Sequence, residues 1–281
     1  MRKYVSSLLM IVSCYSNALA SEEKVPVPKE WEHQFYVGLN HAGYHYLEPN
    51  ITQDEYVPRW GAVWVKDVGT LWGGTASYRL TWQEQAFIQP ELTLLYGKHQ
   101  YNFGRKDKLR SKTKHAIPAL IFEPRLTLGW NIVIYKRVTL SPYSGVGYRF
   151  KSDDSDEVRT SRGNKLGHYR KSNYVYIPIG ASADYQLNET WSVSIKGEYD
   201  WIVKAWHYSR IPNHQPTIFK QPNGYGLKGE ASINYLYKEM KFSLSPYVHY
   251  WNIRNSEEKK GGAMEPYNMT WETGLKMGIT F

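Results

Sequence analysis

The last thirteen residues of the chain alternate between two kinds of side chain. From Met269 to Phe281 the odd-numbered positions are apolar apart from Thr273, and the even-numbered positions are Thr, Glu, Gly or Lys. A period of two places alternate residues on opposite faces of a β-strand, whereas a helical face repeats every 3.6 residues. The same alternation recurs upstream, for example over 138–150, 191–204 and 242–251. The sequence therefore predicts β-strands that each have one apolar and one polar face.

Ten such segments can be marked, and they are joined by connections of two kinds. Tight connections near 83–85, 135–136, 188–189 and 238–239 alternate with long polar ones near 47–68, 104–113, 152–171, 207–223 and 255–267. The predicted strands are 32–46, 69–82, 86–103, 114–131, 137–151, 172–187, 190–206, 224–237, 240–254 and 268–281. We predict an all-β, up-and-down antiparallel barrel, because short turns at one end and long loops at the other are typical of that plan. Twelve strands are the alternative, since Trp60–Val65 could form an extra strand.

The polar face decides between a soluble barrel and a transmembrane one. Its acids and bases are equal in number: Glu91, Glu123, Asp184, Glu198, Asp200, Glu230 and Glu272 against Arg79, Arg125, Arg149, Lys196, Lys204, Lys228 and Lys276. Such a balance suits an enclosed lumen better than the outer surface of a soluble barrel. Aromatic residues of the apolar face gather at both strand ends, as in the interfacial girdles of membrane barrels. We therefore predict a transmembrane β-barrel whose lumen holds an ion network.

The first twenty residues have the pattern of a secretory signal peptide. Arg2 and Lys3 precede a short apolar core, and Ala18-Leu19-Ala20 forms an A-x-A cleavage site. The predicted organisation is a signal peptide at 1–20, an N-terminal periplasmic segment at 21–31 and the barrel at 32–281.

Cys14 is the only cysteine and lies inside this signal. The exported chain is therefore predicted to lack disulfides and thiolate sites. An alternative is that Ile11–Cys14 forms a lipobox, in which Cys14 would be lipidated and retained.

The C-terminal pattern carries a family resemblance. Trp271-x-x-x-Leu275-x-Met277-x-Ile279-x-Phe281 resembles the last strand of Gram-negative outer-membrane β-barrel proteins, which ends in Phe and is read by the barrel assembly machinery. Shorter stretches at 43–49, 140–149 and 242–247 look like those of a poorly characterised group of barrel surface proteins. The resemblance implies an outer-membrane location, contact with outer-membrane lipid and lipopolysaccharide, and assembly through the final strand. It implies no activity.

The lumen charges allow two functional interpretations. A ten-stranded barrel is barely wider than its side chains, so acids and bases inside it would meet and form a structural network. The alternative is a narrow small-solute channel or porin lined by these charges, although a selectivity filter normally shows one sign in excess.

Catalysis finds little support in the residues. Omptin proteases also have ten tall strands, and their signature is an Asp-x-Asp pair and an Asp-x-His pair at the barrel rim. This chain has Asp154-Ser155-Asp156 but no Asp-x-His, and His207 and His214 have no acid two residues before them. We predict no catalytic residue, no cofactor and no metal site, and keep an omptin-like protease as a remote alternative.

Basic residues are concentrated in the second long loop. They are Lys98, Arg105, Lys106, Lys108, Arg110, Lys112 and Lys114, against Asp107 alone. A loop of this charge attracts polyanions. The sequence therefore predicts a non-enzymatic surface or adhesion protein whose loops bind lipopolysaccharide phosphates or, as a second choice, acidic glycans. Nucleic acid is not an expected partner of an exported chain without a binding fold.

Overall fold

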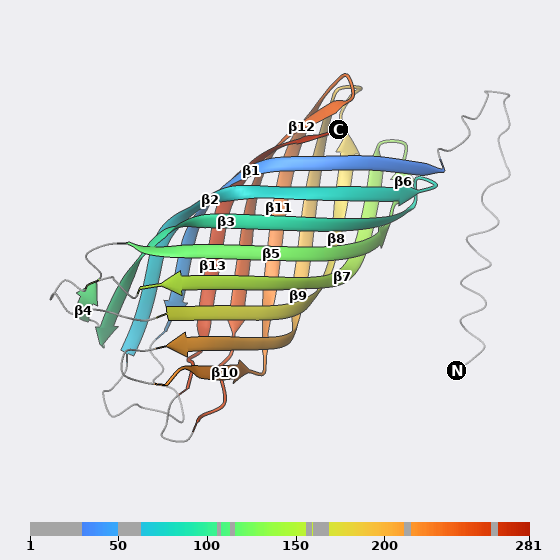
Figure 1. Cartoon of the computed structure of the whole chain (residues 1–281). Helices are drawn as coiled ribbons and strands as arrows, with labels where there is room; N and C mark the ends of the chain where they lie inside the picture. The colour runs from blue at the N-terminus through green and yellow to red at the C-terminus, as the bar shows by residue number, and fades with distance from the viewer. Residues whose placement is uncertain are drawn as a thin grey trace, which may run out of the picture.

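A computed structural model describes residues 30–49, 63–105, 108–112, 116–155, 159, 169–210, 215–259 and 264–281 (Figure 1). Ten long antiparallel strands form a closed barrel, so the predicted strand number is confirmed and twelve is wrong. The strands are β1 (Trp31–Glu48), β2 (Val63–Trp82), β3 (Ala86–Arg105), β5 (Ile117–Trp130), β7 (Val138–Asp154), β8 (Tyr169–Gln186), β9 (Trp191–Arg210), β11 (Gly224–Tyr237), β12 (Met240–Ile253) and β13 (Asn268–Thr280).

Three short strands extend this barrel. β4 (Lys108–Lys112) pairs with β3, β6 (Ile132–Tyr135) pairs with β7, and β10 (Thr217–Gln221) pairs with β9. Residues 63–65, which the sequence left open as part of an extra strand, are the upper end of β2. No helix in the described ranges is long and apolar enough to cross a membrane.

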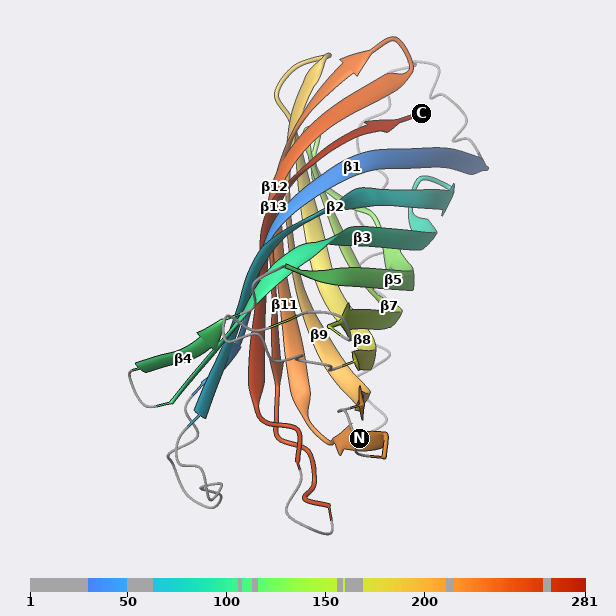
Figure 2. The same cartoon turned by 60° about the vertical axis from the view of Figure 1, so that its left-hand side comes forward.

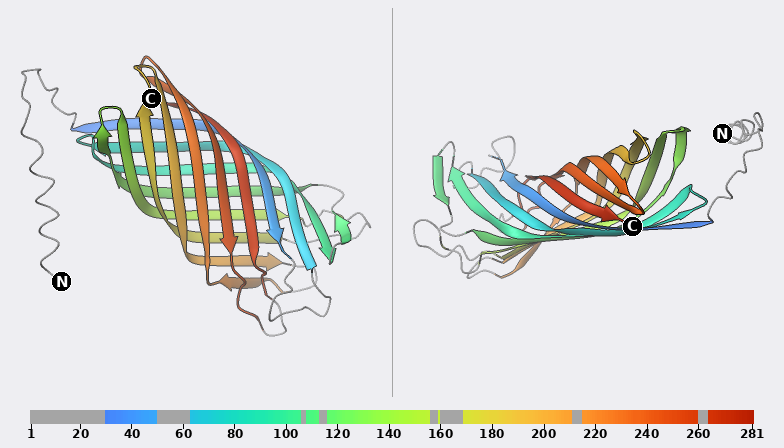
Figure 3. Two further views of the ribbon diagram at one scale, coloured as in Figure 1. Left: turned by 180° about the vertical axis from the view of Figure 1, so that it is seen from behind. Right: turned by 90° about the horizontal axis from the view of Figure 1, so that it is seen from above.

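The barrel closes between its first and last strands. β1 and β13 pair over twelve residues, from Tyr36 opposite Thr280 to Leu47 opposite Met269. Below that ladder the backbone of Phe35 exchanges two hydrogen bonds with Phe281. The C-terminus therefore lies beside β1 at the end of the short turns (Figures 1 and 2). The strands of the two walls cross at a steep angle, as tilted strands of a closed sheet must (Figure 3).

The two faces of the strands follow the predicted alternation. Large apolar side chains are exposed on the outer face, among them Leu39, Leu92, Leu128, Val146, Ile195 and Met277. Exposed aromatic residues lie near the short turns, including Trp82, Trp130 and Phe281, and form a second level at Trp72, Tyr96, Trp201 and Trp271. An apolar band between two aromatic levels is the outer surface of a transmembrane barrel. We call the second level, which is the one nearer the long loops, the upper girdle. The strand ends beyond it project toward the long loops.

Six prolines stand inside the strands, where each lacks the N–H that a ladder hydrogen bond needs. Pro90, Pro124 and Pro246 keep the register of their strands, although one ladder is interrupted beside each of them. The clear register shift lies instead between β8 and β9, where Val175 pairs with Lys204 and Tyr176 pairs with Ile202. An antiparallel residue donates to one neighbour only, so a proline can lose its donor without moving the register.

Candidate functional site

The middle of the lumen holds an ion cluster centred on Lys228 of β11. Its ammonium Nζ lies 2.7 Å from an oxygen of Glu123, 3.3 Å from one of Glu198 and 3.8 Å from one of Asp200. These three carboxylates are buried. Glu198 stands opposite Lys228 in the adjacent strand β9, which also carries Asp200, whereas Glu123 reaches Lys228 from β5 across the lumen.

Two arginines extend this cluster. Arg125 reaches Glu91 at 2.9 Å and Glu198 at 2.7 Å, and the Tyr143 hydroxyl donates to Glu198 at 2.7 Å. These contacts join β3, β5, β7 and β9 across the lumen.

Arg149 of β7 makes the corresponding contacts on the other side. It bonds Glu123 at 2.6 Å and also donates to Glu272 of β13. The His249 ring lies 3.4 Å from Asp200 and 4.0 Å from Glu272. Buried charges are tolerated when they are paired and hydrogen-bonded in this way.

The remaining predicted lumen residues lie nearer the short turns, with one exception. Glu230 and Lys276 form an ion pair, Asp184 accepts a hydrogen bond from Ser194 at 2.5 Å, and Lys196 lies over the Tyr143 ring. Arg79 bonds Asn131 at 2.7 Å and lies over the Phe87 ring.

The exception is Lys204, for which the prediction of a lumen position is wrong. The β8/β9 register shift adds one residue to β9, so Val203 and Lys204 are both exposed on the outside and Ile202 is buried in the lumen.

On the long-loop side of the ion cluster the lumen is filled by apolar side chains, which were not predicted from the sequence. One cluster includes Tyr44, Leu71 and Ile121, and the other includes Tyr176 and Trp251. Cavity volume falls accordingly, from about 210 Å³ near the short turns to about 60 Å³ beside the ion cluster and about 10 Å³ at the long-loop end. The signal was present in the sequence, because Tyr44, Leu71 and Ile121 stand at lumen-facing positions.

The long-loop end of the lumen holds a second group of ionisable side chains, also missed. His99 Nε2 lies 3.0 Å from Asp153, which pairs with Lys151 at 2.8 Å, and His99 Nδ1 lies 3.6 Å from Asp67. A cavity of about 10 Å³ lies beside them.

Glu265 lies in the connection before β13, outside the membrane-spanning strands. Burial raises the pKa of its carboxyl to about 8, with the nearby Glu48 raising it further and Arg170 opposing. The backbone N–H of Glu265 donates to Ser256 at 2.8 Å, and its side chain lies 3.6 Å from His207.

A cationic and aromatic patch covers the outer face of β7 to β10 beyond the upper girdle. We call it the outer patch; its cations are Lys171, Lys204, Arg210 and Lys220, and its rings are Tyr148, Tyr169, Trp206 and Tyr208. Lys204 lies 5.4 Å from the Trp206 ring, and Lys171 lies 5.0 Å and 5.9 Å from those of Tyr169 and Tyr208. Asp154, opposite Tyr169 in the ladder, also lies on this face.

Most of the predicted basic loop falls where side chains are not described. Lys98 is exposed on the outer face of β3. Arg105, Lys108, Arg110 and Lys112 are placed by backbone only, and Lys106 and Lys114 lie outside the described residues.

Residues considered for catalysis or metal binding do not assemble into a site in the described ranges. Asp154 ends β7, and Asp156 and His214 lie outside the described residues. His207 shares a hydrogen bond with the Ser172 hydroxyl inside the lumen. His41 and His45 stand four apart on β1, and the His41 ring packs against the Trp72 ring at 4.0 Å between centroids. No group of three His, Cys, Asp or Glu in those ranges could hold a metal ion.

Comparison with known proteins shows that the fold of this barrel has been seen before. No family model matches the chain, and no curated protein matches it. Among solved structures, the chain is similar to the outer membrane protease OmpT from Escherichia coli, with a TM-score of 0.60, 9% identity and coverage of 89% of this chain and 96% of that one. The chain therefore has the closed ten-stranded fold that is seen in an outer-membrane β-barrel protein.

A second solved structure found is OprG from Pseudomonas aeruginosa, with a TM-score of 0.36, 13% identity and coverage of 87% and 95%. At 9% identity, the likeness to OmpT shows that the two chains share a fold and does not show that they share an activity.

Proposed function

We propose that this outer-membrane barrel is a non-enzymatic surface protein with a closed lumen, which binds polyanions at its long-loop end. The principal ligand is the phosphate of the surrounding lipopolysaccharide, and acidic glycans are the second choice. The outer patch is the observation that carries this proposal.

The position of the outer patch relative to the membrane favours lipopolysaccharide phosphate as the ligand. It begins directly beyond the upper girdle, at the level where a membrane barrel meets the headgroups of the outer leaflet. Lysines that lie on aromatic rings combine a charge for phosphate with a flat surface for the adjoining sugars. Lys98 adds a further exposed cation on β3, and Arg105, Lys108, Arg110 and Lys112 follow at the long-loop end of β3 and on β4.

The contents of the lumen support a surface role over the channel alternative. The ion cluster and the two apolar clusters stand in series between the ends of the barrel, and both consist of buried side chains. Purified protein in a planar bilayer should therefore give no steady conductance.

The test compares lysines of the outer patch with a lysine of the lumen. The variant Lys171→Gln/Lys204→Gln removes two cations of the outer patch, whereas Lys196→Gln removes a lumen lysine of β9 and serves as the control. Binding to bisphosphorylated lipid A should weaken about a hundredfold or more in the double variant, because each of the two lost charge-assisted contacts is worth roughly 1.5–3 kcal/mol. Equal binding by the double variant and wild type, or equal binding to dephosphorylated lipid A, would contradict the proposal.

Assembly is a further part of the proposed function. Phe281 is exposed on the outer face at the end of the closing strand β13, where its ring stacks against Phe35. We assign this residue to recognition by the barrel assembly machinery before the barrel closes.

A further inference from the structure

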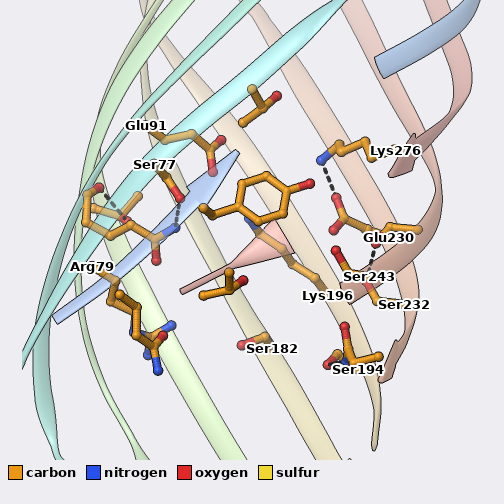
Figure 4. Close-up of a pocket in the computed structure, with 18 of the residues that line it drawn as sticks. Ser77, Arg79, Glu91, Ser182, Ser194, Lys196, Glu230, Ser232, Ser243 and Lys276 are labelled. Carbon is orange, nitrogen blue, oxygen red and sulfur yellow. Dashed lines mark hydrogen bonds and ion pairs between the residues drawn. The ribbon is translucent and has the colours of Figure 1, made fainter. Parts of the chain in front are cut away.

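The cavity of about 210 Å³ near the short turns belongs neither to the ion cluster nor to the outer patch. Its wall is rich in hydroxyl and amide groups, including Ser77, Ser182, Ser194, Ser232 and Ser243 (Figure 4). Hydroxyls both donate and accept hydrogen bonds, so a wall of this kind matches a ligand that carries hydroxyls itself. Short turns of bacterial outer-membrane barrels face the periplasm, which makes that compartment the source of the ligand.

Positive charge exceeds negative charge around this cavity. It is lined by Arg79, Arg125, Lys196, Lys241 and Lys276 and by the carboxylates Glu91 and Glu230. Arg125 is ion-paired with Glu91, and Lys276 is ion-paired with Glu230.

Three cations are left over by these pairs. Lys196 stands opposite Glu230 in the β9/β11 ladder, yet the Glu230 carboxylate is bonded to Lys276 of β13 (Figure 4). Within the described ranges no ion pair is formed by Lys196, Lys241 or Arg79, although Asp184 and Glu32 contribute negative charge near Arg79. A cavity with such an excess favours an anion and disfavours a metal cation.

Aromatic rings complete the wall. The Tyr143 ring lies 5.3 Å from Lys196 Nζ, and the Phe87 ring lies 3.6 Å from the Arg79 guanidinium carbon. Tyr36 also lines the cavity. Binding sites for small molecules combine ring faces of this kind with a few placed polar and charged groups.

We infer that this cavity is a binding site for a small polyhydroxylated anion of the sugar-phosphate class, taken from the periplasm. Lys196 of β9 holds the phosphate, Lys241 of β12 adds positive charge at the short-turn end of the same cavity, and the serine hydroxyls bond the sugar. The site is at the other end of the barrel from the outer patch. Sugar-phosphate binding at this site can therefore be tested independently of lipopolysaccharide binding.

Titration calorimetry on the folded barrel in detergent micelles tests this site. The probes are glucose 1-phosphate, glucose and inorganic phosphate, and we expect saturable binding that is tightest for glucose 1-phosphate. Lys196→Gln should weaken it about tenfold, the effect of one lost charge-assisted hydrogen bond. Lys66→Gln, exposed on the outer face of β2 and part of neither binding site, should leave it unchanged.

A second variant guards against misfolding of the first. Lys241→Gln lies on β12, which is separated from β9 by β11, and should also weaken glucose 1-phosphate binding, because it removes positive charge from the same cavity. Resistance of the unheated barrel to SDS shows that each variant is folded. Absence of saturable binding in wild type, equal affinity in both folded lumen variants and wild type, or inorganic phosphate binding as tightly as glucose 1-phosphate would overturn the inference.

Discussion

Lys228 is the lumen residue whose removal should cost the most. Lys228→Ala leaves Glu123, Glu198 and Asp200 facing one another without the ammonium that lies within 3.8 Å of all three. Breaking a buried pair in this way costs roughly 3–5 kcal/mol. Lys241→Ala removes a lumen lysine without an ion pair and should cost less than about 1 kcal/mol. Urea unfolding in lipid vesicles measures both, and equal losses would mean that water already screens the cluster.

Glu265 predicts a pH dependence at the long-loop end. Its pKa of about 8 is raised above the ordinary carboxyl range, so the folded chain binds this proton more tightly than the unfolded chain. The stability contributed by the protonated form is present at low pH and is lost as pH rises from the ordinary carboxyl range to about 8. Glu265→Gln keeps the carboxamide neutral and should flatten this loss, each unit of pKa elevation being worth about 1.4 kcal/mol.

The measurement is the free energy of unfolding of wild type and Glu265→Gln at several pH values between about 5 and 9. Glu258, exposed in the same connection, provides the control variant Glu258→Gln. A pH profile of Glu265→Gln that parallels wild type would show that another group is responsible.

Residue partners are where prediction from the sequence ends. Alternation placed Lys228, Glu198 and Glu230 on the lumen face, and the structure has them there. It could not give Glu123 as the partner of Lys228, because that contact crosses the lumen between residues 105 positions apart. Periodicity defines a face, whereas barrel closure and side-chain length decide which charges meet.

At the scale of strands, the sequence predicted centres better than ends. β2 begins at Val63 rather than 69, and β9 continues to Arg210 rather than 206. Beyond the upper girdle both faces carry polar or aromatic groups, so alternation no longer marks the strand. The same loss of contrast hid the extra residue in β9 that turns Lys204 outward.

The two faces of a strand should differ in their tolerance of charge. Leu275 of β13 is exposed in the apolar band, and Val193 of β9 faces the same way. Replacing either by Arg places a charge in hydrocarbon and should cost roughly 2–4 kcal/mol. Thr280→Arg and Ser194→Arg, on the lumen face of the same strands, should cost less. Unfolding in vesicles of matched lipid compares the four variants, and equal tolerance on both faces would exclude the lipid contact assigned here.

For the whole molecule, ten strands and two kinds of connection were enough to predict the barrel. The contents of its lumen were predicted only in part, because the apolar clusters around Tyr44 and Trp251 occupy positions expected to be polar. These clusters divide the barrel into a hydroxyl-lined end and an end bearing the outer patch. The molecule therefore presents different chemistry to the two sides of the membrane.

Orientation in the membrane gives the last prediction. Short turns of bacterial outer-membrane barrels face the periplasm and long loops face the medium. Glu84, Glu189 and Glu239 are exposed in short turns, whereas Glu257 and Glu258 are exposed in the last long connection. A glutamyl endopeptidase added to intact cells should therefore cut after Glu258 and spare the three turns, since all five carboxylates are accessible and only the side differs. Disrupted cells provide the control, in which the turns become cleavable. Cleavage of intact cells confined to the short turns would reverse the topology, and with it the compartment assigned to each binding site.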